Sequence, residues 1–482
     1  MLLATSVACA PRDADPPARP PNVVLILADD LGWRDTAVYG SAFYETPNID
    51  RLASEGMRFS DAYAASPLCS PTRAGLLTGL DPGRLRLTLP FAHEEEVILD
   101  PRVPERGPPG ERAVAAESRT RLPLEHRTIA EALREAGYAT ALFGKWHLGH
   151  GTYRPERQGF DVARPGGSLH APPRYLSPYQ MPRFPDGPKG EHLDERLASE
   201  AARFMSAHPG QPFFLCFWPF SVHFPFQADP ALLRKYESKA DPGDPQHYPN
   251  MGAMIESLDN AVGIVLDAID ALGQRENTIV VFLSDNGGVD RNYAPNSALP
   301  PPTDNAPLRG GKGQLYEGGI RVPLIVRWPE RVAPGSTSSE VVTTTDLHPT
   351  LLELVGLTPP NPEQLDGISI LPALSRQPLP RQDVFFHFPH YMSPDVFRPS
   401  TAVRRGRWKL IRFYADTEDQ QDRFELYDLE TDVGETRDVS GEQPGLVVEL
   451  AGAIERYLLE TGALVPFPNP AYRPERGATA QD

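Results

Sequence analysis

The sequence has very few cysteines, no long apolar run and no excess of basic residues. Its three cysteines among 482 residues, Cys9, Cys69 and Cys216, are too few for a disulfide framework. No stretch approaches the roughly 18 consecutive apolar residues of a membrane-spanning helix, so a multi-pass membrane protein with a transmembrane core is excluded. The 47 Lys and Arg are outnumbered by 64 Asp and Glu, which gives a net charge of −17. This acidity argues against a nucleic-acid partner, but a few cations in a cleft would still bind one small anion.

What the chain has is length, apolar content and proline. Apolar residues make up 40% of the sequence and charged residues 23%, which is typical of a soluble globular protein. The length suffices for one large α/β domain or two to three average ones. Proline accounts for 54 residues, about twice the usual share. We therefore expect long irregular connections over a regular core.

Residues 1–21 are predicted to form a leader or a disordered N-terminus. A short apolar stretch precedes Cys9, and a proline-rich segment follows it. The pattern resembles the end of a bacterial export signal, and Ser6 to Cys9 loosely resembles a lipoprotein cleavage box in which Cys9 is lipidated. A basic segment before the apolar stretch is missing, so a frayed tail is the alternative. We expect an exported protein, periplasmic or lipid-anchored.

The central part of the chain predicts an α/β fold with a large, mostly parallel sheet flanked by helices. Residues 22–28 form a continuous apolar run rich in β-branched side chains, as in a strand buried on both faces. Thr128 and Glu131 have the spacing of a helix capping box. Helices alternating with apolar strands indicate a sheet covered on both sides. The other predicted strands are 138–143, 213–218 and 278–283, and the predicted helices are 46–56, 128–136, 194–207 and 251–272.

The predicted domain boundaries follow from changes in composition and in the pattern of predicted strands and helices along the chain. We expect a main domain over residues 22–375 and a smaller C-terminal α+β subdomain over 376–482. The subdomain has predicted short strands at 402–413 and 424–429 and a helix at 444–461, which indicates an antiparallel sheet with one helix. Residues 101–121, rich in Pro, Arg and Glu without periodicity, are predicted to be an exposed loop.

Polar side chains gather where the predicted strands end. In an open α/β sheet, ligands bind beyond the carboxyl ends of the strands. Random placement would scatter these residues along the chain. The residues at such ends are Asp29 and Asp30, Asp285 and Asn286, Lys145 and His147, and His223.

Two of these pairs predict a metal site. Asp29, Asp30, Asp285 and Asn286 offer only oxygen atoms, which suit Ca²⁺ or Mg²⁺ better than Zn²⁺. Adjacent aspartates reach one ion only if the chain turns there, and Gly32 permits a turn. Either pair alone is also compatible with a helix N-cap.

Cys69 lies in a setting that favours reactivity. We expect Ser70 to cap a short helix with Pro71 at its first position, so that Cys69 lies at the helix N-terminus and Arg73 one turn on. That environment favours a thiolate or an oxyanion. A buried structural cysteine and an ordinary thiol nucleophile remain alternatives.

The segment Cys69-Ser70-Pro71-Thr72-Arg73 resembles the C-x-P-x-R signature of type I sulfatases. The resemblance extends in the right order over about residues 22–464, and it implies an alkaline-phosphatase-like fold. Other similar stretches are 24–32, 46–50, 137–147, 311–321 and 426–432.

The resemblance also implies roles for the residues. A dedicated formylglycine-generating enzyme would oxidise Cys69 to Cα-formylglycine, whose hydrate supplies a nucleophilic hydroxyl and, with Asp29, Asp30, Asp285 and Asn286, contacts one Ca²⁺ or Mg²⁺. Arg73 would stabilise the hydrate. His147 would take a proton from its second hydroxyl, which expels sulfate.

Further residues would act on the sulfate ester itself. Lys145 and Lys312 would bind sulfate oxygens, and His223 would protonate the leaving group. Lys145 and His147, two residues apart, would point to one face of an extended chain. Glycines at 310, 311 and 313 would let the backbone come close.

The predicted function is hydrolysis of sulfate monoesters by an arylsulfatase-like sulfuric ester hydrolase acting on a small-molecule or glycan ester, with a sulfated carbohydrate favoured. A phosphodiesterase or phosphonate monoester hydrolase of the same superfamily, or an unmodified anion-binding pseudoenzyme, are the alternatives. Specificity is expected from loops 101–121, 170–188 and 293–305. Among the other histidines, His348 is expected to be structural. His387 and His390 are candidates for the substrate pocket, although a structural role is favoured for both. His93, His170 and His192 are expected in loops from which they could touch substrate.

Overall fold

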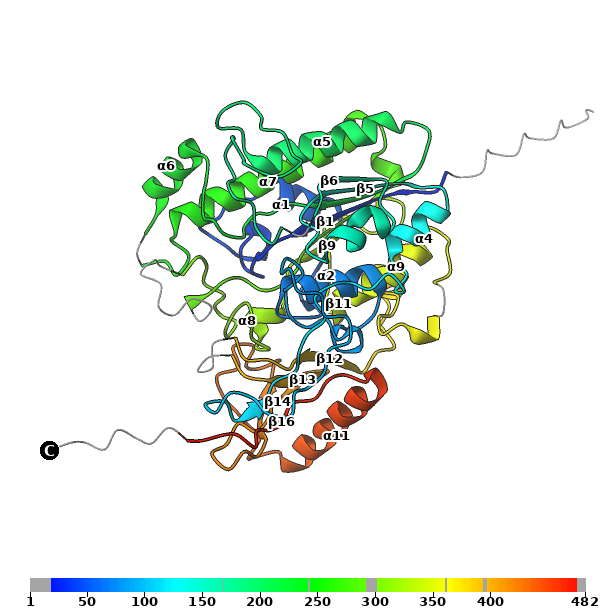
Figure 1. The fold of residues 1–482 in the computed structure, drawn as a ribbon. Helices are drawn as coiled ribbons and strands as arrows, with labels where there is room; N and C mark the ends of the chain where they lie inside the picture. The colour runs from blue at the N-terminus through cyan, green and yellow to red at the C-terminus, as the bar shows by residue number, and fades with distance from the viewer. Residues whose placement is uncertain are drawn as a thin grey trace, which may run out of the picture.

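The fold is organised around a central sheet of eight strands, seen edge-on in Figure 1. The computed structural model describes residues 19–167, 169–241, 243–291, 301–359, 362–392 and 397–474. The strands are β1 Asn22–Ala28, β2 Met57–Phe59, β5 Ala139–Gly144, β6 Val162–Pro165, β7 Phe213–Trp218, β8 Thr278–Ser284, β9 Leu324–Arg327 and β10 Ser336–Ser338.

The strand order is β10-β2-β9-β8-β1-β7-β5-β6. From β8 to β6 every neighbouring pair is parallel, and β9 runs antiparallel to both β8 and β2. The prediction of a large, mostly parallel sheet is therefore confirmed. The carboxyl ends of β8, β1, β7 and β5 lie side by side along one edge.

Both faces of the sheet are covered by helices. In β1, Val24 and Ile26 pack into one hydrophobic core, whereas Val23 and Leu25 pack into the other. This alternation explains why the whole strand is apolar. The first face carries α1 Pro47–Glu55, α5 Leu193–Ala207 and α7 Pro249–Ala271, with α6 Pro230–Lys239 outside α7, and the second carries α2 Cys69–Thr78, α4 Ile129–Glu135 and α9 Leu347–Leu354.

Helix α4 begins with the predicted capping box. The Thr128 hydroxyl accepts a hydrogen bond from Glu131 N at 3.1 Å, and the Glu131 carboxylate accepts one from Thr128 N at 2.9 Å. The helices predicted from the sequence all lie within a few residues of their expected bounds. Among the described residues, none of the helices combines the length and the apolar character that crossing a membrane requires. The leader segment up to residue 18, with Cys9, lies outside the described residues.

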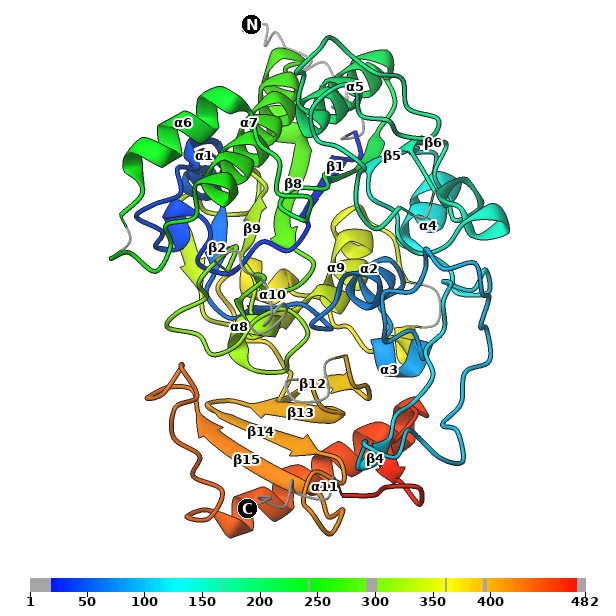
Figure 2. The same cartoon turned by 60° about the vertical axis from the view of Figure 1, so that its left-hand side comes forward.

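A second sheet forms the C-terminal part of the molecule (Figure 2). It contains β12 Asp383–Phe388, β13 Ser400–Arg405, β14 Trp408–Phe413 and β15 Arg423–Asp428, all antiparallel in this order. One face packs on α11 Pro444–Thr461 through Val403, Leu410 and Leu426. The other face packs on the main part of the protein, where Ala402 and Ile411 share a core with Tyr63.

The expectation of an exposed loop over residues 101–121 is wrong for its second half. Strand β4 Ala113–Val114 is buried and pairs antiparallel with β16 Phe467–Pro468, near the end of the described chain. Arg121 is fully buried. The pairing with a segment more than 350 residues away has no local signal in the sequence. The remaining short elements are β3 Ala62–Tyr63, β11 Val342–Thr343, α3 Pro82–Leu85, α8 Glu317–Ile320 and α10 Leu371–Leu374.

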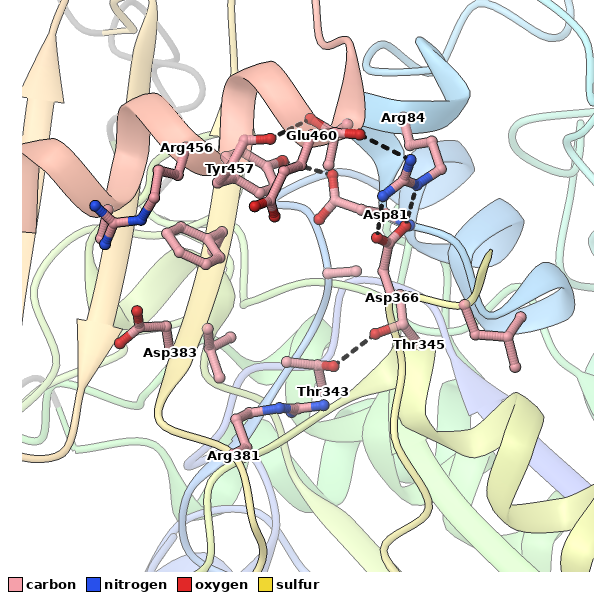
Figure 3. Close-up of a pocket in the computed structure, with 16 residues that line it drawn as sticks. Asp81, Arg84, Thr343, Thr345, Asp366, Arg381, Asp383, Arg456, Tyr457 and Glu460 are labelled. Atoms are coloured by element: carbon pink, nitrogen blue, oxygen red, sulfur yellow. Dashed lines mark hydrogen bonds and ion pairs between the residues drawn. The ribbon is translucent and has the colours of Figure 1, made fainter. Parts of the chain in front are cut away.

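A cavity of about 360 Å³ lies where α11 meets the main part of the protein (Figure 3). Tyr457 of α11 donates a hydrogen bond to Asp81 Oδ1 at 2.5 Å, and Arg84 forms two hydrogen bonds to the Asp366 carboxylate at 2.7 and 2.8 Å. Arg381 is likewise paired with Asp346 on the main part. Arg84 and Arg381 are therefore each neutralised by an aspartate, and the Tyr457 hydroxyl joins α11 to the main part through Asp81.

Candidate active site

Six chain segments meet at the carboxyl edge of the central sheet. They are the end of β1, the start of α2, the turn after β5, the loop after β7, the end of β8 and the glycine-rich loop before α8. The structure brings together every site residue predicted from the sequence, and each is at most 5% exposed. These residues are Asp29, Asp30, Cys69, Arg73, Lys145, His147, His223, Asp285, Asn286 and Lys312.

Asp29 and Asp30 lie on a sharp turn at the end of β1. The turn occurs at Asp30 itself, whose φ of 65° is left-handed and uncommon for a residue with a side chain. The prediction that Gly32 provides the turn is wrong, because Gly32 lacks a positive φ. Gly32 is needed for space instead: a Cβ there would lie 2.6 Å from Asn305 Oδ1. The conformation of Asp30 lets two consecutive carboxylates face one site.

Three carboxylates and three cations form a buried, charge-balanced cluster. Lys145 Nζ lies 2.7 Å from Asp29 Oδ2, and Lys312 Nζ lies 2.6 Å from Asp30 Oδ1. Although burial opposes ionisation, Lys312 and His223 hold the pKa of Asp30 below its usual range. The two lysines predicted to bind sulfate oxygens are thus ion-paired with the acidic residues here. Burial without water requires such pairing.

Arg73 connects three segments of the site. Its Nε and Nη2 donate to Asp285 Oδ2 at 2.9 and 2.7 Å, and its Nη1 donates to the carbonyl of Lys145 at 2.9 Å. Its guanidinium also lies 5.2 Å from the ring centre of Trp218. A planar group with donors on several edges suits this bridging role, which a lysine would not fill.

The acidic residues offer ligand atoms for a divalent cation. One atom each from Asp29, Asp30, Cys69 and His223 lies within 4.8 Å of the others. Asp29 Oδ1 and Asn286 Oδ1 are buried and have no hydrogen-bond partner among the described residues. Buried oxygens without partners, in an oxygen-rich set, fit a hard cation such as Ca²⁺ or Mg²⁺.

Asp285 and Asn286 border this group rather than standing apart from it. Asn286 Nδ2 donates to Asp30 Oδ1 at 2.9 Å, and Asp285 Oδ1 accepts from Asp30 N at 3.2 Å. The two strand ends are therefore tied directly to each other.

Cys69 is the first residue of α2, and Leu68 takes the cap position. The prediction that Ser70 caps the helix is wrong, since its hydroxyl donates to the carbonyl of His147 at 2.6 Å. The expectation that this setting favours a thiolate is also wrong. Burial raises the pKa of the Cys69 thiol to about 12, and outweighs the positive charges of Lys145 and Lys312.

His147 has a left-handed backbone with a φ of 55°. The prediction that an extended chain points Lys145 and His147 to one face is wrong. Both side chains reach the site because the chain turns after β5. The turn depends on Gly144, where a Cβ would lie only 1.8 Å from the carbonyl oxygen of Trp218. Burial, reinforced by Lys145 and Arg73, lowers the pKa of His147 well below its ordinary value, so its ring is neutral.

His223 follows β7 on a loop held by a buried carboxylate. Its Nδ1 lies 3.1 Å from the carbonyl of Phe224, and its Nε2 lies 3.7 Å from Asp30 Oδ2. Asp194, near the start of α5, accepts hydrogen bonds from the main chain of Phe220 and Ser221, both at 3.1 Å. Asp194 has no distinguishing signal in the sequence, because an acidic residue in a first helical turn is common.

The glycines of the loop before α8 serve close packing within the protein. Lys312 N donates to the carbonyl of Gly288 at 3.0 Å, and Gly313 N donates to that of Pro67 at 2.9 Å. At Gly311 a Cβ would lie 2.6 Å from the Gly288 carbonyl oxygen. The close approach predicted for these glycines is therefore an approach to neighbouring backbone.

The other histidines divide into two groups. His93 and His170 lie beside His147: the rings of His93 and His170 are 4.3 Å apart, and those of His147 and His170 are 6.2 Å apart. Four others are structural. His192 caps α5, His348 contacts the Leu77 carbonyl at 2.9 Å, and His387 and His390 contact Thr401 and Thr88 at 2.8 and 2.7 Å.

For His387 and His390 the structure supports the favoured structural role and not the alternative role in the substrate pocket. Both are buried, with 2% of their surface exposed, around the C-terminal sheet, and their ring nitrogens face other parts of the protein. His387 in β12 and His390 just after it therefore contribute to packing inside the protein.

Comparison with known proteins agrees with the geometry. The sulfatase family model matches residues 21–357, and the model for the C-terminal part of N-sulphoglucosamine sulphohydrolase matches residues 311–458. Arylsulfatase A of Homo sapiens is 34% identical, covering 92% of this chain and 88% of its own length. N-acetylgalactosamine-6-sulfatase of Canis lupus familiaris is 34% identical, covering 77% of this chain and 69% of its own length.

A solved structure shares the whole arrangement. The crystal structure of Ps i-CgsB in complex with k-i-k-neocarrahexaose is 27% identical, with a TM-score of 0.73, covering 92% of this chain and 94% of that one. The similarity therefore spans both the main part and the C-terminal part of the chain. The chain belongs to the sulfatase family and is a sulfuric ester hydrolase.

Proposed function

We propose that the protein releases sulfate from sulfate monoesters of carbohydrates, using a formylglycine formed at Cys69 and one bound Ca²⁺ or Mg²⁺. The observation that carries this proposal is the position of Cys69, at the start of α2 in a C-x-P-x-R segment and packed against Asp29, Asp30 and His223. A formylglycine-generating enzyme would be the maturation partner.

Asp29, Asp30, Asp285 and Asn286 would hold the cation, with residue 69 at its edge. When bound, the cation supplies positive charge to the sulfate oxygens, and formylglycine supplies a hydroxyl nucleophile. The protein's own cluster is already charge-balanced. A divalent cation added to it gives the excess positive charge that an anionic ester requires.

The remaining residues would orient the ester and move protons. Lys145 and Lys312 lie at the two aspartates and would turn an ammonium proton toward a sulfate oxygen. His147, neutral and buried, would accept a proton at Nδ1, which has no partner among the described residues. His223 would donate a proton from Nε2, and a bound anionic ester beside it favours the protonated ring.

The carbohydrate substrate class rests on relatives. Two of the similar proteins carry carbohydrate names, N-acetylgalactosamine-6-sulfatase and the structure with k-i-k-neocarrahexaose. Of the loops predicted to set specificity, 170–188 begins with His170, whose ring lies beside those of His93 and His147. In loop 293–305, residues 293–300 fall outside the described residues. Localisation as an exported protein remains our expectation from the first residues.

The test compares sulfate release from an aryl sulfate, an aryl phosphate and a panel of sulfated glycans. We expect the aryl sulfate to be hydrolysed faster than the phosphate, and at least one glycan to release sulfate. Mass spectrometry of the peptide with Cys69 should show the aldehyde. Cys69→Ala should abolish turnover, whereas Cys216→Ala, at an equally buried cysteine in β7, should keep it. Full activity with an unmodified thiol would refute the proposal.

A further inference from the structure

A chain of three side chains leads from the surface to His147. His93 Nδ1 lies 3.1 Å from His147 Nε2, within hydrogen-bond distance. On its other side, His93 Nε2 lies 3.4 Å from a carboxylate oxygen of Glu94. The exposed fraction of the side chain falls from 57% at Glu94 to 30% at His93, and His147 is buried with 2% of its surface exposed.

The Glu94 carboxylate at one end of this chain favours one tautomer of His93 and, through it, one tautomer of His147. Burial lowers the pKa of both His93 and His147, so both imidazoles are neutral and each carries one N–H. The Glu94 carboxylate favours the proton of His93 on Nε2, because a lone pair facing a carboxylate is repelled. His93 Nδ1 is then an acceptor, and His147 must donate to it from Nε2. This leaves the lone pair on His147 Nδ1.

The lone pair of His147 Nδ1 has no donor to satisfy it among the described residues, and the atom is buried. The His147 carbonyl is fixed by the Ser70 hydroxyl at 2.6 Å, one residue from Cys69. With the backbone held on one side and Nε2 on the other, the ring has a single orientation.

We propose that Glu94 and His93 are positioning residues that hold His147 as its Nε2–H tautomer, with Nδ1 free to take a proton from residue 69. This inference rests on the proposed function, which gives His147 the proton-accepting role. The arrangement extends the common device of a group behind a catalytic histidine that fixes its tautomer.

The segment carrying these two residues is anchored through its main chain. Arg121, fully buried, donates to the carbonyls of Phe91 and Glu94, and the Thr120 hydroxyl donates to that of Glu96 at 3.1 Å. A buried cation is thus used to fix a partly exposed loop beside the site. This anchoring gives His93 a defined position without a place in the hydrophobic core.

The test uses two variants of similar size at position 93. In His93→Asn the amide oxygen takes the place of Nδ1 and still accepts from His147, whereas His93→Leu fills the space without an acceptor. We expect His93→Leu to lower kcat about 10- to 100-fold with KM within about twofold, and His93→Asn to recover most of kcat. Equal losses in both variants would overturn the proposal.

The carboxylate is tested by a matched pair of neighbours. Glu94→Gln removes the charge that faces His93, and Glu95→Gln makes the same change one residue on, at another exposed position. We expect a severalfold loss of kcat for Glu94→Gln and none for Glu95→Gln. An unchanged kcat in Glu94→Gln would show that the Glu94 carboxylate does not help to fix the tautomer of His147.

A spectroscopic measurement separates this inference from the proposed function. Nitrogen-15 shifts of labelled histidine, assigned to residue 147 with a His147→Gln variant, report which ring nitrogen carries the proton. We expect an Nε2–H tautomer in the wild type and in His93→Asn, and a mixture in His93→Leu. This result would stand even if no sulfate ester were hydrolysed. An Nδ1–H tautomer in the wild type would refute the positioning role of His93 and Glu94, but it would not contradict the proposed sulfatase activity.

Discussion

Lys409 on β14 is predicted to be one of the most sensitive positions for stability. Its side chain is fully buried, with Nζ 2.9 Å from Glu317 Oε1 and 2.8 Å from Glu435 Oε1. Glu317 has further partners, Arg321 at 2.7 Å and the Tyr63 hydroxyl at 2.7 Å. Removing Lys409 therefore leaves Glu435 with the N–H of Glu317 but without the cation that Lys409 supplied, whereas Glu317 keeps Arg321. Lys409→Met keeps the shape of the side chain and deletes only the charge.

The expected cost at pH 8 is about 3–5 kcal/mol, the usual range when one partner of a buried ion pair is removed. For a chain of 482 residues the entropy of unfolding is about 1 kcal/mol per kelvin, so the melting temperature should fall by about 3–5 °C. Such a shift is well within the range that calorimetry resolves.

The cost should depend on pH in a defined direction. Burial raises the pKa of Glu435 to about 7, above the value of about 4.3 in an unfolded chain. An acid with a raised pKa stabilises the fold when protonated, and this contribution is lost as pH rises from about 4.3 through about 7. Without Lys409 the pKa rises further. At pH 5.5 Glu435 is protonated with or without Lys409, so the destabilisation by Lys409→Met should be smaller than at pH 8 by about 1.4 kcal/mol, the free energy that ionisation of a group with a pKa of about 7 supplies at pH 8.

The assay is calorimetric and urea-induced unfolding at pH 8 and pH 5.5. Arg437→Met is the control, because it deletes a positive charge from an exposed pair with Glu442 and should cost less than about 1 kcal/mol. Adding Glu435→Gln to Lys409→Met should recover stability at pH 8. A loss below about 1 kcal/mol at pH 8, or an equal loss at both pH values, would refute the reasoning.

Three further predictions concern the metal, the leaving group and a helix cap. Purified protein should contain about one equivalent of Ca²⁺ or Mg²⁺ by elemental analysis, and Asp29→Asn should lose it; stoichiometric Zn²⁺ that resists chelation would contradict the assignment. His223→Ala should slow esters with poor leaving groups far more than activated aryl sulfates, whereas a uniform loss across leaving groups would argue against proton donation by His223. Thr128→Ala should destabilise the protein by about 1 kcal/mol in urea unfolding, because it removes a capping box that Glu131 completes, and an unchanged midpoint would show that α4 does not need it.

The sequence predicts the framework well because its signals are local and periodic. The run from Asn22 to Ala28 is apolar at every position, and only a strand covered on both faces explains that pattern. Parallel strands then place their carboxyl ends at one edge. For this reason Asp29 and Asp285, 256 residues apart, could be assigned to one site before any coordinates were known.

The errors arise where a conformation depends on distant partners. The turn at Asp30 and the left-handed backbone of His147 are both uncommon for residues with side chains, so propensity does not reveal them. Ser70 has the chemistry of a cap, but the carbonyl of His147 takes its hydroxyl. The thiolate expected at Cys69 rests on the helix N-terminus and Arg73, whereas complete burial raises the pKa of the thiol. Burial of a charged site is a tertiary property.

The contact between His93 and His147 illustrates the same limit for function. His93 lies in an irregular segment with no hydrophobic period, and 54 residues separate it from its partner. Nothing in that segment distinguishes a histidine that meets the site from one in an ordinary loop. The difference comes from Arg121, whose buried guanidinium fixes the loop from outside it.

The C-terminal sheet contributes to the site although none of its residues lies in it. Lys312 precedes α8 by a few residues, and α8 begins with Glu317, whose carboxylate contacts Lys409 of β14. Glu317 N also donates to the carboxylate of Glu435, a residue that follows β15 in the chain, at 2.7 Å. The loop that carries Lys312 is thus held at one end by Pro67, two residues before Cys69, and at the other by the C-terminal part. Because buried ion pairs fix geometry more strictly than apolar contacts, this attachment sets where the Lys312 ammonium lies relative to Asp30. The C-terminal sheet therefore helps to position the Lys312 ammonium in the site.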